Sequence, residues 1–116
     1  SERVLQGQDG TFNGNFTSAK SFDTFCPVGP FIQTNFEQNP ELGIKCFVNN
    51  ELKQDGNTRD MIFSIGDILC FVSSIMTLLP GDVILTGTPE GVSQVGPGDE
   101  IKIEIETIGT LVNSIK

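Results

Sequence analysis

The sequence contains no histidine, tyrosine or tryptophan. Histidine is the commonest general base near neutral pH and a frequent metal ligand, so its absence removes both roles from this chain. A Ser-His-Asp or Cys-His hydrolase cannot be assembled from the residues present. Any chemistry must therefore use carboxylates, lysine, arginine, hydroxyl groups and backbone atoms, or be completed by residues outside the chain.

Basic residues are also scarce. Seven Lys and Arg stand against 15 Asp and Glu, which gives a net charge of −8. This balance argues against nucleic acid or an anionic membrane as a partner, because both require a basic face. No apolar run approaches the ~20 residues that a membrane span needs.

Only three cysteines are present, Cys26, Cys46 and Cys70, and none forms a Cys-x-x-Cys pair. Neither a zinc site nor a redox dithiol is indicated. We expect Cys46 and Cys70 to act as small buried hydrophobes. Reduced cysteines favour the cytoplasm, or a mitochondrion if the source is eukaryotic.

The 116 residues, 37% of them hydrophobic, have the size and composition of one small globular domain. The chain begins Ser-Glu-Arg, without methionine, a basic stretch or an apolar stretch. We therefore expect no signal peptide here, and we interpret the chain as a fragment or a processed product.

The hydrophobic pattern is β-rich with one main helix. Short strands are predicted at 31–34, 83–86 and 111–115, and alternation at 101–106 predicts a half-buried strand. Residues 43–54 predict a hairpin that turns at Asn49-Asn50. Apolar residues at helical spacing predict a helix from Ile65 to Leu79, with Ser64 as its cap and Pro80-Gly81 as its end. We expect its apolar stripe to pack into a core.

Two segments contain candidate functional residues. Lys20 precedes an alternating apolar and polar stretch, where a lysine is usually a solvated surface residue. In a pocket it would instead neutralise a substrate carboxylate or an enolate oxygen. The Thr-Gly-Thr-Pro-Glu-Gly stretch at 86–91 is either an ordinary turn or a ligand loop, in which Gly87 lets the backbone approach a ligand and Thr88 offers a hydroxyl.

Two further pairs have weaker interpretations. Glu104 and Glu106 could place two oxygen ligands side by side for a hard cation, but their position on the polar face of a strand favours simple solvation. Arg3 and Gln6 would share one face of a helical turn, although residues at a chain terminus are usually frayed.

The combination of motifs is more specific than any one of them. Residues 20–30 have the sequence Lys-Ser-Phe-Asp-Thr-Phe-Cys-Pro-Val-Gly-Pro, and 80–92 have Pro-Gly-Asp-Val-Ile-Leu-Thr-Gly-Thr-Pro-Glu-Gly-Val. With Val48-Asn49, Gln54, Thr58 and Met-Ile-Phe at 61–63 between them, these segments resemble the fumarylacetoacetate hydrolase family, in its acylpyruvase and 2-hydroxyhepta-2,4-diene-1,7-dioate isomerase-like branch. The resemblance runs in order from residue 1 to about residue 113.

The resemblance implies that residues 1–116 are the C-terminal part of a single catalytic domain, a mixed β-sandwich roll that is incomplete in this chain. It also implies homodimers and a Mg²⁺ ion bound by an aspartate and a Glu-x-Glu pair. By the family's spacing these ligands lie upstream of Ser1, so we expect no metal ligand in this chain. Glu104-x-Glu106 is not that pair, because it follows the Gly-Thr-Pro loop.

Residue by residue, Lys20 matches the family's active-site lysine and Thr88 the threonine of its Gly-Thr-Pro loop. Arg3 and Gln6 match a Ser/Thr-x-Arg-x-x-Gln segment near the substrate, and Gly87 belongs to the same loop as Thr88. Asn50 stands where the family usually has glycine.

The expected activity of the complete enzyme is hydrolysis of a C–C bond in a 3-acylpyruvate or a related diketo acid. The metal would act as a Lewis acid on the 2-oxo acid. Keto-enol isomerisation and oxaloacetate decarboxylation use the same enolate, so both stay open as alternatives. A non-catalytic scaffold is a third, and the sequence upstream of Ser1 would distinguish it.

Overall fold

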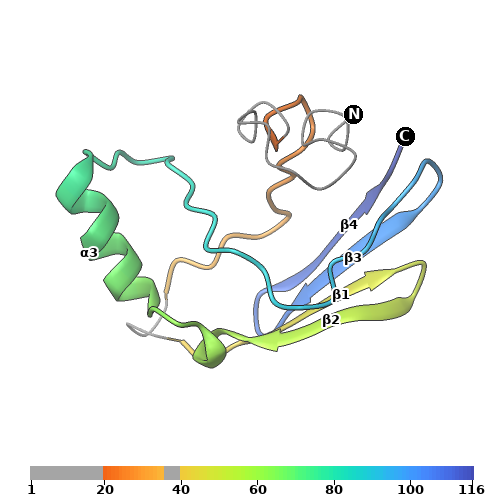
Figure 1. Ribbon diagram of the computed structural model, residues 1–116, viewed down its shortest axis with the longest axis horizontal. Helices are drawn as coiled ribbons and strands as arrows, with labels where there is room; N and C mark the ends of the chain where they lie inside the picture. Colours follow the sequence, from red (N-terminus) through yellow and green to blue (C-terminus); the bar gives the residue numbers. More distant parts are fainter. Residues whose placement is uncertain (1–19, 36–39) are drawn as a thin grey trace, which may run out of the picture.

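A computed structural model describes residues 20–35 and 40–116, and within them one antiparallel sheet and one α-helix stand apart from each other (Figure 1). The elements are β1 (Gly43–Val48), β2 (Glu51–Asn57), the 3₁₀ turn η1 (Thr58–Asp60), α3 (Ile65–Ile75), β3 (Glu100–Ile105) and β4 (Gly109–Ser114). The four strands lie in the order β2-β1-β3-β4. This arrangement confirms the predicted fold class, a β-rich partial domain with one main helix.

The β1–β2 hairpin forms as the sequence predicts. Asn49 and Asn50 both adopt positive φ, 50° and 66°, as the central residues of a type I′ turn do. Asparagine tolerates this left-handed conformation better than most non-glycine residues, so Asn50 can replace a turn glycine. The Asn49 side chain also donates to Asp99 Oδ1 at 2.8 Å and accepts from the Glu100 amide at 3.0 Å, which ties the turn to the start of β3.

The register of the hairpin slips by one residue in β2. Cys46 pairs with Gln54, whereas the next residue of β1, Phe47, pairs with Leu52, so Lys53 is an extra residue without a partner in β1. Such a bulge bends a strand and redirects its neighbouring groups. β2 is an edge strand of the described sheet. The bulge therefore changes the direction of the backbone groups on its outer edge, which are free to contact other parts of the chain.

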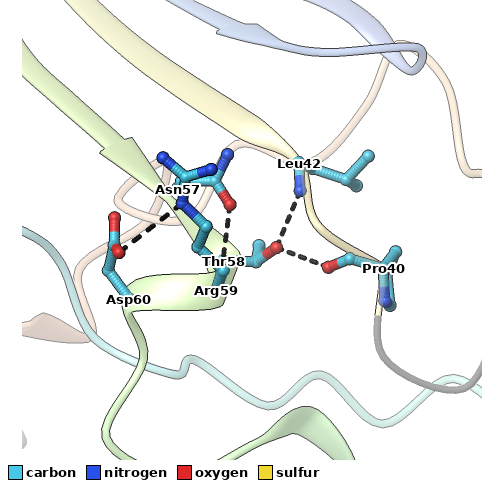
Figure 2. A network of polar contacts seen from close by, with 6 residues as sticks. All are labelled: Pro40, Leu42, Asn57, Thr58, Arg59 and Asp60. Carbon is cyan, nitrogen blue, oxygen red and sulfur yellow. Dashed lines mark hydrogen bonds and ion pairs between the residues drawn. The ribbon is translucent and has the colours of Figure 1, made fainter.

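Polar contacts close the open end of the hairpin (Figure 2). Thr58 Oγ1 accepts from the Leu42 amide at 2.8 Å and donates to the Pro40 carbonyl, while the Thr58 amide donates to the Leu42 carbonyl at 3.0 Å. Asn57 caps η1 by accepting from the Arg59 amide at 3.0 Å. Thr58 therefore joins the end of β2 to the segment that leads into β1.

Two predicted strands are wrong. Residues 31–34 and 83–86 form no strand, and most of their apolar side chains are exposed, 78% for both Ile32 and Leu85. A strand exists only when a neighbour accepts and donates its backbone hydrogen bonds. The described sheet pairs β1–β4 only with one another, so an apolar run is not enough to make these segments strands.

The helix is shorter than its apolar pattern. It ends at Ile75, four residues before Leu79, so Pro80-Gly81 does not terminate it. The predicted core stripe is also wrong for this chain: no side chain of α3 is fully buried, and Leu69, Ile75 and Leu79 are 45%, 63% and 64% exposed. Cys70 is exposed as well, and Cys46 is only partly buried, although that burial raises the pKa of its thiol. Within the described residues, no helix has the length and apolar character needed to cross a membrane.

The capping box at the start of α3 is confirmed. Ser64 Oγ accepts from the Asp67 amide at 3.1 Å, and Asp67 Oδ2 accepts from the Ser64 amide at 3.2 Å. Each contact satisfies an amide that the first turn leaves without an intrahelical acceptor.

Replacing Ser64 by alanine is expected to lower the free energy of unfolding of the complete protein by about 1 kcal/mol, because one capped amide loses its acceptor. Urea denaturation measures the change. Ser73→Ala is the matched control, since its Oγ donates only to the Cys70 carbonyl within α3, at 3.1 Å. Equal effects of the two substitutions would contradict the role assigned to the cap.

Candidate functional site

The loop that follows Thr86 is held against β2 by the side chain of Gln54. Gln54 Nε2 donates to Thr88 Oγ1 at 2.9 Å, to the Pro89 carbonyl at 2.8 Å and to the Glu90 carbonyl at 3.2 Å. One amide group of an edge strand therefore contacts three consecutive residues of the loop. These contacts join residues more than 30 positions apart, so the segment is fixed by tertiary contacts whether it is an ordinary turn or a ligand loop.

The loop approaches the bulge of β2 too closely for any side chain at Gly91. A Cβ atom added at Gly91 would lie 2.0 Å from the Lys53 carbonyl oxygen, and Gly91 has a φ of +94°. A second contact lies beside it, because a Cβ atom at Gly56 would be 3.2 Å from Pro89 Cγ. The bulged residue Lys53 is thus the one whose carbonyl meets the loop, and only glycine fits at position 91.

Gly87 and Thr88 are consecutive residues of this loop. Gly87 has a φ of +105°, which glycine adopts without strain, and no atom lies within 4 Å of where its Cβ would be. The space beside Gly87 is consistent with close approach of a ligand. Thr88 is exposed and its hydroxyl oxygen is anchored by Gln54.

Lys20 is exposed and begins the described part of the chain. The residues after it do not continue as a strand: the Phe25 amide donates to the Phe22 carbonyl at 3.1 Å, and Thr24 has a φ of 71°, so the chain turns. The Phe22 and Phe25 rings stack at a tilt, with centroids 5.2 Å apart. The meeting of Lys20 with Thr88 in one pocket stays a prediction, and Arg3 and Gln6 lie outside the described residues.

Glu104 and Glu106 have structural partners. Lys102 Nζ lies 3.0 Å from Glu104 Oε1, and Glu106 Oε2 accepts from the Gly43 amide at 3.1 Å. Lys102 Nζ is also 4.4 Å from the centroid of the Phe47 ring. Both carboxylates therefore have partners in or beside the sheet.

No metal site is assembled by residues 20–35 and 40–116: no three or more His, Cys, Asp or Glu side chains among them are arranged to hold an ion. The described residues therefore do not fit the Mg²⁺ ion that the family resemblance implies. Asp99, which immediately precedes β3, makes hydrogen bonds instead. Its pKa is lowered by hydrogen bonds from the Gly96 amide, the larger effect, and from the Asn49 side chain.

Gln54 is the residue whose role the sequence does not reveal. It belongs to the segments that carry the family resemblance, but an isolated glutamine in a strand gives no sign of the loop it will contact. The contacts reach a loop 34 to 36 positions away, and that approach does not follow from local sequence.

Comparison with known proteins supplies the context of this site. A family model described as "Fumarylacetoacetate (FAA) hydrolase C-terminal" matches residues 1–116. The chain spans less than half the length of the curated relatives from Methanocaldococcus jannaschii, Mycobacterium tuberculosis and Archaeoglobus fulgidus that it matches, the first at 51% identity over 114 residues. The match therefore concerns one part of a longer type of protein.

Two solved structures are similar in both sequence and fold. The 2-hydroxyhepta-2,4-diene-1,7-dioate isomerase from Mycobacterium marinum is 46% identical, with a TM-score of 0.83 over 97% of this chain and 42% of that one. A maleylpyruvate hydrolase from Sphingobium sp. SYK-6, solved in complex with manganese(II) and pyruvate, is 42% identical, with a TM-score of 0.80 over 88% of this chain and 39% of that one.

Proposed function

The chain belongs to the fumarylacetoacetate hydrolase family, and from that premise we propose that the complete protein is a metal-dependent hydrolase that cleaves a C–C bond of 3-acylpyruvates or related diketo acids. The observation that carries the proposal is the similarity to a maleylpyruvate hydrolase whose structure contains a divalent metal ion and pyruvate. Pyruvate is also the product expected when a 3-acylpyruvate is hydrolysed, so the bound product supports this substrate class.

The metal ligands of the complete enzyme are proposed to lie upstream of Ser1, where the spacing of the family motifs puts them. Mg²⁺ is the proposed ion, and a homodimer is the proposed assembly. The contribution of this chain is to bind and orient the substrate.

In the proposed reaction water adds to the acyl carbonyl, and the bond between that carbon and C3 of the pyruvate part breaks. The acyl part leaves as a carboxylic acid, while the electrons of the broken bond form the pyruvate enolate, which is then protonated at C3. Lys20 is proposed to offset the negative charge of the carboxylate or of the enolate oxygen. Thr88 is proposed to fix the orientation of a substrate oxygen without adding charge.

A second candidate is isomerisation of a 2-hydroxy-diene dioate, favoured by the 46% identity to the Mycobacterium marinum isomerase. Decarboxylation is related chemistry: a bifunctional isomerase/decarboxylase of 4-hydroxyphenylacetate degradation from Salmonella dublin is 48% identical over 98 residues, 83% of this chain and 23% of that protein. All three reactions pass through an enolate of a 2-oxo acid, so they would use Lys20 and Thr88 alike.

The test uses the complete protein with a divalent cation present. It is incubated in three separate reactions with a 3-acylpyruvate, a 2-hydroxy-diene dioate and oxaloacetate. The expected result is pyruvate and a carboxylic acid in equal amounts from the acylpyruvate, with slower turnover of the other two. Quantification of products by chromatography distinguishes the reactions. Turnover of the diene or of oxaloacetate alone would reject the hydrolase in favour of the corresponding alternative.

A further inference from the structure

The hydrogen bonds of Gln54 determine which way its amide points. All three contacts of its Nε2 are made to oxygen atoms, two of them backbone carbonyls that can only accept. Exchanging the oxygen and nitrogen of the amide would set Oε1 against those two carbonyls, where no hydrogen is available for a bond. The NH₂ group of Gln54 therefore faces the loop, and it has only hydrogens to offer there.

This orientation also fixes the role of the Thr88 hydroxyl. A hydroxyl has one hydrogen to donate and can accept through its lone pairs. The NH₂ group has two hydrogens for three acceptors, so at least one hydrogen is shared between two of them. Because Nε2 cannot accept, Thr88 Oγ1 can only be the acceptor in their 2.9 Å contact, and its own hydrogen is directed elsewhere. An exposed hydroxyl anchored in this way is prepared to donate to an oxygen of a ligand.

Two further close contacts of the loop lie beside these bonds. Gly91 adjoins the Lys53 carbonyl, and Pro89 adjoins Gly56, so the loop is held on both sides of Gln54. Fixing a donor before the substrate arrives makes its interaction with developing charge more effective, because no reorganisation is needed.

We propose that Gln54 is a positioning residue: it holds the Thr88–Glu90 loop on β2 and sets Thr88 as a hydrogen-bond donor toward an anionic or carbonyl oxygen of the substrate. This inference rests on the proposed function for the identity of the substrate. It adds a residue that acts through Thr88 and does not touch the substrate itself.

The test combines Gln54→Glu with Thr88→Val in the complete enzyme. Glutamate keeps the length of the side chain, but it repels the Pro89 and Glu90 carbonyls and accepts the Thr88 hydrogen that the substrate needs. Gln54→Glu is expected to lower kcat/KM on a 3-acylpyruvate about 10- to 100-fold. In the Thr88→Val background the same change is expected to lower kcat/KM much less, because the hydroxyl that Gln54 positions is already absent.

Two variants serve as controls. Gln33→Glu makes the same change of charge at an exposed glutamine, and it is expected to leave kcat/KM unchanged. Gln54→Met removes the donor without adding charge. It is expected to lower kcat/KM in the same direction, so the inference stays testable if Gln54→Glu does not fold.

Hydrogen exchange of the peptide that covers 86–92 provides a measurement independent of turnover. Faster exchange is expected in Gln54→Glu and Gln54→Met, with β3 and β4 unchanged. Additive effects of Gln54→Glu and Thr88→Val, or unchanged exchange of the loop, would overturn the inference while leaving the hydrolase intact. Absence of acylpyruvate cleavage in the wild type would reject the proposed function, whereas the exchange measurement would still decide whether Gln54 positions the loop.

Discussion

Replacing Lys20 by methionine is expected to lower kcat/KM of the complete enzyme on 3-acylpyruvates by roughly 10²–10³, by analogy with the loss of one oxyanion donor. Methionine is similar in length but uncharged, so the negative charge of the substrate carboxylate or the enolate would lose its partner. Thr88→Val is expected to cost less, because a neutral hydroxyl orients an oxygen but does not compensate a charge. Steady-state kinetics of both variants measure the difference.

Lys45→Met is the control for loss of a lysine. Lys45 lies in β1, where its Nζ is 3.7 Å from Asp55 Oδ2 and its side chain is 47% exposed, so its removal is expected to leave kcat/KM close to that of the wild type. The fold should survive in every case, since Lys20 and Thr88 are exposed and lie outside the four strands. Wild-type kinetics for Lys20→Met, or a complete structure with Lys20 and Thr88 on opposite faces, would refute the assignment.

Gly91→Ala is expected to lower the free energy of unfolding of the complete protein by about 2–4 kcal/mol, through backbone strain and overlap together. The added Cβ would lie 2.0 Å from the Lys53 carbonyl oxygen, at a φ of +94° that alanine rarely adopts. Relieving the overlap requires the loop or the Lys53 segment of β2 to shift, and either shift would disturb the contacts that hold Thr88. Activity on 3-acylpyruvates is therefore expected to fall together with stability.

Two other glycines separate the causes. Gly98 has the same φ of +94° as Gly91, but nothing lies within 4 Å of its Cβ position, so Gly98→Ala measures backbone strain alone. Gly96 has neither a positive φ nor a neighbour within 4 Å, so Gly96→Ala provides the baseline. Urea denaturation should rank the losses Gly91 above Gly98 above Gly96. A loss at Gly91 no greater than at Gly98 would mean that the contact with Lys53 is unimportant.

The sequence predicts correctly those parts of the fold that depend on interactions between residues close in sequence. The hairpin forms because two asparagines tolerate positive φ, and α3 begins at Ser64 because Ser64 and Asp67 satisfy each other's amides. The alternation at 101–106 predicts β3 because the chain also supplies the two neighbouring strands that pair with it.

The predictions that fail depend on partners distant in sequence. Residues 31–34 and 83–86 are apolar enough for strands, but the described chain provides no strand to pair with them. The stripe of α3 has helical spacing, but spacing does not determine what covers a helix. In the candidate site, the family motif singles out Gly87 and Thr88 as candidates, whereas the contacts of Gln54 depend on a loop 34 positions away in sequence.

The loop that contains Thr88 lies against an edge strand, so its position matters for the solubility of the protein as well as for the proposed catalysis. An edge strand without a cover is a template for intermolecular pairing, and a loop laid across it is one of the ways proteins prevent this. Here the cover is the segment that presents Thr88, bound at Lys53 and Gln54. Selection against aggregation would therefore preserve the geometry of this loop even if selection for turnover were relaxed.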